Sequence, residues 1–305
     1  MRIPLPGDLD GRGFSVETGR AAGLGRNRLN GRDLSAPFWG IRVATPLVTA
    51  QDFATAYATR MPAGAFFSHQ TAASILGIPL PFHASTPLPL HVSSVAALRG
   101  PTGEGTVGHH LQIDPIDVIE HSGLAVTGLA RTVFDLAATL DDEALLAALD
   151  NILWHRRAAT LRATHESLAD AFTRFHGRRG RSRLLELMPL ACDRSDAPPE
   201  SAFRLRFRRA GFPPAIPNER VYDAHGRFLA MPDLQFRGFR MAFDYEGDYH
   251  RTDQAQWRKD LARVPRLQDD GWHHTRISGD DLQDPSELLH RTRRILIQRG
   301  WRPPR

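Results

Sequence analysis

The sequence contains very little cysteine and lysine and has no long hydrophobic run, and these absences narrow the classes of protein to consider. Among 305 residues there is one cysteine, Cys192, which excludes an internal disulfide framework and a cysteine-rich zinc site. No stretch approaches the roughly 18 consecutive apolar residues of a transmembrane helix. The amino-terminal stretch MRIPLPGDLDGRGF lacks the apolar core of a signal peptide. We therefore expect a cytoplasmic globular protein without a membrane partner.

The basic residues are almost entirely arginine, because Lys259 is the only lysine. The formal net charge is +5. GC-rich coding is sufficient to account for this bias. A surplus of arginine nevertheless favours polyanionic partners, since the planar guanidinium pairs with phosphate. The composition therefore favours a polyanionic partner without identifying it.

The length and the local patterns predict a multidomain α/β protein. A chain of 305 residues is too long for one small domain. We expect an amino-terminal winged-helix-like unit, a mixed α/β region, a helical connector with a basic loop, and a carboxyl-terminal α-β-β-β-α-β domain. Their expected bounds are 1–45, 46–140, 141–192 and 193–305. The sequence does not reveal an oligomeric state.

Two short helical pieces flank Gly23-Leu24-Gly25, and a turn at Trp39-Gly40 then leads into a short strand. This order resembles a truncated winged helix-turn-helix, in which the second helix contacts DNA. The resemblance places Arg26, Arg28 and Arg32 on or near that helix as candidate DNA contacts. The alternative is a packing unit of the same shape that no longer binds DNA.

The region 46–140 reads as mixed helices and strands. A helix is expected over 68–81, with Ser68 as its N-cap and Gly77 at its end. The phrase ARTVFDLA, within 123–140, resembles the central part of AbiEi-type abortive-infection antitoxins. That resemblance implies a partner toxin by analogy alone. The neighbouring His109 and His110 lack a cysteine or carboxylate at ligand spacing, so we expect no metal there.

A glycine-rich basic stretch, HGRRGRSR, occupies 176–183. Its arginines and backbone N–H groups are suited to holding a nucleic-acid backbone without reading its sequence. A solvated charged turn is the alternative interpretation. The candidate phosphate contacts are Arg178, Arg179 and Arg181.

The carboxyl-terminal region brings acidic residues onto predicted strands. Helices are expected at 199–211, 253–272 and 285–300, and Pro265 should kink or break the middle helix. A first strand is expected in PNERVYDAHGRF (217–228), leading into a turn at Asp223 to Gly226, and further strands at 228–236, 239–246 and 273–278. Side chains two apart on a strand share a face, so Asp244 and Glu246 point one way. The alternate residues Met241, Phe243 and Tyr245 point the other way, and Asp233 lies on the partner strand.

This order of elements, with acids on the second and third strands, resembles the PD-(D/E)XK nuclease superfamily. It is more similar still to a bacterial family of unknown function related to the very-short-patch repair endonucleases. The resemblance covers about residues 197–300 and implies a metal-dependent DNA endonuclease in phage defence or DNA repair. The matching residues are Pro199-Glu200-Ser201, Arg204, Ala210-Gly211, Asn218, Pro232-Asp233-Leu234, Gly247, His250, Trp257, Asp260, Arg263, Leu267 and Gly271-Trp272.

Phosphodiester hydrolysis needs an activated water and a stabilised oxyanion, and Mg²⁺ (or Mn²⁺) on carboxylates provides both. Asp233, Asp244 and Glu246 are the expected metal ligands. Glu200 is expected to hold a metal-bound water, and His250 to act as general acid or base. The expected phosphate contacts here are Arg204 and Arg263. The alternative, purely structural interpretations are a Glu200–Arg204 pair on a helix surface and a core histidine at position 250.

One difference between this sequence and the family pattern bears on the expected nuclease activity. The family usually reads Glu-x-Asp-Gly at the third strand, whereas this chain reads Asp244-Tyr245-Glu246-Gly247, with the two acids exchanged. Glu246 also stands where many superfamily members have lysine, so no positive charge is supplied there. The alternative function is therefore a catalytically inactive DNA-binding antitoxin-like protein or transcriptional regulator that keeps the nuclease fold as a scaffold. An RNase is a third possibility.

Overall fold

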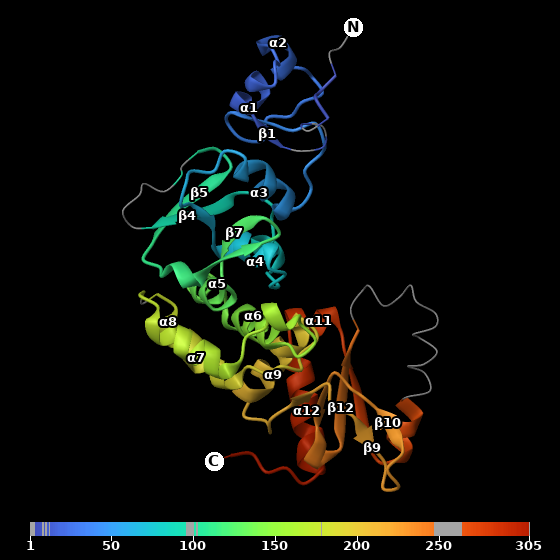
Figure 1. The fold of residues 1–305 in the computed structure, drawn as a ribbon. Helices are drawn as coiled ribbons and strands as arrows, with labels where there is room; N and C mark the ends of the chain where they lie inside the picture. Colours follow the sequence, from blue (N-terminus) through green and yellow to red (C-terminus); the bar gives the residue numbers. More distant parts are fainter. Residues whose placement is uncertain are drawn as a thin grey trace. The chain divides into compact units, whose positions relative to one another are not determined.

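The computed structural model describes residues 4–7, 9, 11, 13–95, 101, 103–177, 179–246 and 264–304. The chain is a multidomain α/β protein that divides into two compact units (Figure 1). The amino-terminal unit comprises Met1–Leu140 and Ala163–Leu185, and the carboxyl-terminal unit comprises Asp141–Arg162 and Glu186–Arg305. The expected connector 141–192 is thus shared between the two units. Within the described ranges, no helix is both long and apolar enough to cross a membrane.

The amino-terminal unit begins with two short helices and a two-stranded antiparallel sheet. Gly23 and Gly40 adopt positive φ angles of 83° and 75° at the two predicted turns. Leu24 and Leu29 pack with Phe14 in a small core. The bounds are β1 Phe14–Ser15, α1 Val16–Ala21, α2 Arg26–Leu29 and β2 Ile41–Arg42.

The same unit contains a five-stranded sheet with strand order β5-β4-β3-β7-β6. Helix α4 begins at His69, directly after Ser68, and Gly77 lies just beyond its end with φ of 66°, as the sequence predicts. The bounds are α3 Ala50–Ala58, β3 Phe66–Phe67, α4 His69–Ile75, η1 Phe82–Ala84, β4 Leu90–Val95, β5 Thr106–Leu111, η2 Pro115–Asp117, β6 Val118–His121, β7 Leu124–Thr127, α5 Leu129–Leu136, α7 His165–Arg174 and α8 Arg181–Leu187, which extends across the boundary between the units.

The ARTVFDLA phrase forms helix α5, and its charged residues make a buried ion pair. Arg131 Nε donates to Asp135 Oδ1 at 2.9 Å, and Arg131 Nη1 donates to the Gln112 carbonyl at 3.0 Å. Burial raises the pKa of Asp135 to about 6, against the opposing effect of Arg131. Phe134 packs edge-on against Phe175 beside this pair. These residues therefore attach α5 to Gln112, just after strand β5, and to Phe175, just after helix α7.

The carboxyl-terminal unit contains a four-stranded sheet with strand order β13-β12-β11-β8, in which β12 and β13 run parallel. Helix α6 packs against α9. The bounds are α6 Asp142–Leu153, η3 Ala159–Leu161, η4 Met188–Leu190, α9 Pro198–Arg209, β8 Ile216–Pro217, β9 Val221–Tyr222, β10 Phe228–Ala230, β11 Leu234–Phe236, η5 Arg237–Phe239, β12 Met241–Tyr245, β13 His273–Ile277, α11 Gly279–Gln283 and α12 Ser286–Gln298.

The single strand expected over 228–236 is wrong in one respect, because the structure divides it. Strand β10 pairs with β9 in a separate two-stranded sheet, whereas β11 pairs with β12 and β8. Pro232 lies in the break and has no N–H to donate to a ladder. The break leaves Asp233 just ahead of β11, at the end of the sheet where β12 finishes.

Strand β12 packs on both of its faces. Met241 and Phe243 are fully buried in a core with Phe207 of α9 and Leu288 of α12. Ala242 faces a second core that contains Leu267 and Trp272. The predicted alternation along this strand is therefore confirmed, and Asp244 lies on the face of Ala242. Residues 264–269 are helical; the rest of the helix expected over 253–272, apart from its last residues, lies outside the described residues.

Candidate functional site

Asp233 and Asp244 face each other across the antiparallel strands β11 and β12. The register pairs Leu234 with Phe243, which places the two aspartates opposite one another at the next position. The Tyr245 amide donates to Asp233 Oδ2 at 2.7 Å, and the Asp233 amide donates to Asp244 Oδ1 at 3.2 Å. The backbone thus holds both carboxylates at one end of the sheet.

Glu200 of α9 contributes a third carboxylate beside Asp233. Its Oε2 accepts hydrogen bonds from the Asp196 amide at 2.8 Å and from Asn218 Nδ2 at 2.7 Å. The Asn218 amide in turn donates to the Asp233 carbonyl at 3.2 Å. Burial, together with a smaller effect of the Asp233 charge, raises the pKa of Glu200 to about 8. Glu200 does not pair with Arg204, so the alternative of a simple helix-surface pair is wrong.

Two residues of β13 complete this acidic site, and the sequence reasoning assigned a role to neither. His274 Nε2 lies 2.7 Å from Asp244 Oδ2. The parallel register pairs Asp244 with Arg276, so both side chains share one face of the sheet. The predicted strand HHTRIS already indicated that His274 and Arg276 share one face, because side chains two residues apart on a strand point the same way.

Glu246 lies apart from the two aspartates. It forms an ion pair with Arg276 at 3.1 Å, and both side chains are more than half exposed. Asp233, Asp244 and Glu246 do not bring three ligand atoms within 4.8 Å of one another; among the described residues, only a set of histidines does so. Asp233 and Asp244 therefore meet across the paired strands with Glu200 near Asp233, but among the described residues neither Glu200 nor Glu246 completes a set of three ligand atoms within that distance.

Arg204, expected to contact phosphate, holds α9 to α6 instead. Its Nη2 donates to Asp150 Oδ2 at 2.9 Å and to the Leu190 carbonyl at 3.0 Å. Ser201 Oγ donates to the same carboxylate at 2.6 Å, and the Cys192 amide donates to its other oxygen at 2.7 Å. Arg204 and Asp150 are largely buried, so this pair supports the helix that carries Glu200.

Several expected site residues lie outside the described part of the chain. These are Arg178, His250 and Arg263. Near the first of them, Arg179 is exposed, whereas Arg181 Nη1 donates to the Phe175 carbonyl at 3.0 Å. Arg181 therefore fastens the basic loop to the end of α7, and Arg179 presents its charge to solvent.

The expected DNA-contacting arginines of the amino-terminal unit differ in exposure. Arg26 and Arg32 are exposed. Arg28 is buried, and its guanidinium makes a two-point contact with Asp33 at 3.1 and 3.0 Å. Arg28 thus stabilises the turn after α2, which is a structural reason for its presence.

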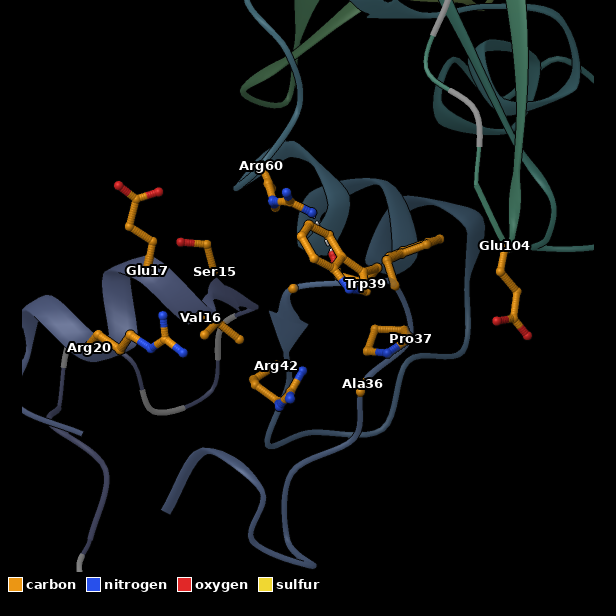
Figure 2. Close-up of a pocket in the computed structure, with 12 residues that line it drawn as sticks. Ser15, Val16, Glu17, Arg20, Ala36, Pro37, Trp39, Arg42, Arg60 and Glu104 are labelled. Carbon is orange, nitrogen blue, oxygen red and sulfur yellow. Dashed lines mark hydrogen bonds between the residues drawn. The ribbon is translucent and has the colours of Figure 1, made fainter. Parts of the chain in front are cut away.

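A pocket of about 670 Å³ lies beside helix α1 and strand β2 of the amino-terminal unit. Figure 2 shows Arg60 next to the Trp39 ring, with Arg20 of α1 and Arg42 of β2 also lining the pocket. The Arg60 guanidinium carbon lies 4.0 Å from the centre of the Trp39 ring, and 82% of Trp39 is exposed. An exposed aromatic ring with nearby arginines is a typical surface for stacking a nucleobase near a phosphate.

Comparisons with known proteins leave the family open. No family model matches the chain. Two uncharacterized proteins of Mycobacterium tuberculosis, MT2308 of strain CDC 1551 / Oshkosh and Rv2248 of strain H37Rv, are each 29% identical over 225 residues. The alignment covers 67% of this chain and 80% of each relative. The crystal structure of the RV2827C protein from Mycobacterium tuberculosis is 16% identical, with a TM-score of 0.42, and covers 69% of this chain and 83% of that one.

Proposed function

We propose that the carboxyl-terminal unit is a metal-dependent endonuclease that hydrolyses phosphodiester bonds in DNA. The observation that carries this proposal is the meeting of Asp233 and Asp244 across two paired strands, with the carboxyl group of Glu200 buried beside them. The resemblance to the nuclease superfamily supports the same reading, because these acids match its strand positions. A role in phage defence or DNA repair follows from that resemblance alone.

The residues present suit Mg²⁺ or Mn²⁺. The nearby donors are carboxylate oxygens, which these ions prefer. Burial, with a smaller effect of the nearby Asp233 charge, raises the pKa of Glu200 to about 8, and a bound cation would favour its charged form. Asp233 and Asp244 would hold the ion, and Glu200 would orient a water. When bound, the ion would supply a polarised water and a counter-charge for the phosphate.

The chain's own residues supply positioning and charge. The hydrogen bond from His274 orients Asp244. Arg276 lies on the same face of the sheet and presents a guanidinium next to Glu246. Because glutamate occupies the usual lysine position, Arg276 is the described residue best placed to provide the missing positive charge to a phosphate. Glu246 would then set the direction of Arg276; its role as a metal ligand remains a prediction.

The test is cleavage of supercoiled plasmid, linear duplex, single-stranded DNA and RNA with Mg²⁺ or Mn²⁺. We expect nicking of DNA by the wild-type protein and its loss in Asp233→Asn and Asp244→Asn. Asp280→Asn, at an exposed position on α11, is the matched control and should cleave normally. Wild-type protein that is inert on every substrate with either ion would overturn the proposal. Preferential cleavage of RNA would change the proposed substrate from DNA to RNA, and the proposed phosphodiester hydrolysis would stand.

A second candidate function is that of a DNA-binding regulator whose nuclease-like unit does not cut. The pocket beside Trp39 and the exposed Arg26 and Arg32 favour it. The expected result is salt-dependent DNA binding that Trp39→Ala weakens by about 1–3 kcal/mol, the contribution of one stacked base. Phe82→Ala removes another exposed ring of the same unit and should leave binding unchanged. Equal binding by the two variants would exclude the pocket as the contact.

A further inference from the structure

Three histidines from separate elements of the amino-terminal unit meet on one face of its sheet. His91 lies on β4, His109 lies on β5, and His69 is the first residue of α4. The parallel register pairs Ser93 with His109, so His91, Ser93 and His109 share a face. One ligand atom from each histidine lies within 4.8 Å of the others. No metal was expected at His109 and His110, because no cysteine or carboxylate stands at ligand spacing, and the partners His69 and His91 are distant from His109 in the chain.

The spacing of the ring nitrogens suits a shared ion. Nδ1 of His91 lies 2.9 Å from Nε2 of His109. Two nitrogens that each bind one ion at about 2.1 Å must be less than about 4.2 Å apart, and these two meet that condition. The ring centres of His69 and His109 are 3.9 Å apart. The three imidazoles are therefore close enough to share one ion, once the nearly parallel rings of His69 and His109 turn about their side-chain bonds so that their nitrogens converge.

A chain of hydroxyl groups supports the third ligand. Ser68 Oγ lies 2.8 Å from Nδ1 of His69 and 2.5 Å from Ser93 Oγ. With Nδ1 occupied in this way, Nε2 of His69 is the nitrogen left for an ion, which is the usual support for a metal-binding histidine. His69 also has a φ of 49°, a backbone conformation that residues with a side chain rarely adopt. The fold thus holds His69 in place at a conformational cost.

We propose that His69, His91 and His109 bind one borderline divalent cation of the zinc class. Imidazole nitrogens select such ions over Mg²⁺. Among the described residues, no cysteine or carboxylate joins the group. Three protein ligands leave a coordination position for water or a substrate oxygen, as in catalytic zinc sites, whereas structural zinc sites have four. This site lies in the amino-terminal unit and does not depend on the proposed nuclease activity.

The test uses the full chain without a histidine tag, stripped with a chelator and then titrated with Zn²⁺ or Co²⁺. We expect one equivalent of zinc to remain after dialysis, and cobalt to give the visible absorption of a nitrogen-ligated ion. His69→Gln, His91→Gln and His109→Gln should each abolish retention. His110→Gln is the control, because its side chain lies on the opposite face of β5.

A milder variant keeps the test informative if a histidine substitution unfolds the unit. Ser68→Ala removes only the support of His69 and should weaken zinc binding by roughly 10- to 100-fold, the usual effect of an outer-shell change. The chain has 14 histidines, so weak background binding is expected in every variant. Wild-type protein that retains no zinc, or a folded His109→Gln variant that retains one equivalent, would overturn the proposal.

Discussion

The acidic site and the histidine cluster respond to burial in opposite directions and reach the same charge state. Burial raises the pKa of Glu200 to about 8, and it lowers the pKa of His69 to about 3 and of His91 to about 4. Each group is therefore driven towards its neutral form. A neutral imidazole is already a ligand for a metal, whereas a neutral carboxyl group must first lose a proton.

The two proposals together assign to one chain two sets of ligands with different ion preferences. Carboxylate oxygens suit Mg²⁺ or Mn²⁺, and imidazole nitrogens suit zinc-class ions. Each set lies in a separate compact unit. A change in one unit can therefore be measured against the other as an internal reference.

The largest expected effect, on the free energy of unfolding, comes from removing the ion pair that supports the helix of the acidic site. Asp150→Ala leaves the largely buried Arg204 without its carboxylate partner. Removing one partner of a buried ion pair costs about 3–5 kcal/mol, so we expect a loss of that size in the free energy of unfolding. Urea denaturation followed by fluorescence measures it.

Asp142→Ala is the matched control, because Asp142 forms a more exposed pair with Arg209. Its effect should be below about 1 kcal/mol. Zinc retention by the histidine cluster should survive both substitutions. If both variants lose equal stability, burial of the Asp150 pair is not what holds α6 to α9.

An intermediate effect is expected from His274→Gln. His274 bonds to Asp244 and would not itself contact the ion. Loss of such an orienting residue lowers metal affinity or activity roughly 10- to 100-fold. Nicking rates measured over a range of Mg²⁺ concentrations separate the two effects. His273→Gln, on the other face of β13, is the control; equal losses in both variants would indicate general damage to the strand.

The expected effect of Glu200→Gln in the absence of metal depends on pH and vanishes in acid. The pKa of Glu200 is raised in the folded state from 4.5 to about 8. Between these values the folded protein binds more protons than the unfolded chain, so stability falls as pH rises. The variant should therefore match wild type near pH 4 and be the more stable of the two at pH 8, with the difference growing steadily between these values. Denaturation at the two pH values measures this, and a gain independent of pH would contradict it.

Local patterns predicted the parts of the fold that depend on neighbours in the chain. The turn glycines Gly23 and Gly40, the start of α4 after Ser68, and the alternation along β12 follow from local rules. The division of the strand at Pro232 was missed, although proline itself gives the reason. The expected hairpin placed Asp233 and Asp244 on partner strands, whereas Glu200 was expected at the site only through the family resemblance.

The sequence did not predict contacts that depend on distant segments. Arg204 matched a nuclease pattern, but its partner Asp150 lies on a helix 54 residues away. Similarly, His91 and His109 are 18 residues apart and meet only because β4 and β5 pair in parallel. Pairing of this kind is set by the whole sheet, and no local spacing encodes it.

Each compact unit is built from two separate segments of the chain, and this determines which fragments can be produced for study. The chain passes from one unit to the other after Leu140, after Arg162 and after Leu185. A fragment that begins at residue 193 would contain the acidic site but lack α6, and with it Asp150. Its Arg204 would remain without a counter-ion. A self-sufficient fragment that carries the acidic site must therefore keep 141–162 and bridge to residue 186 with a short linker that replaces 163–185.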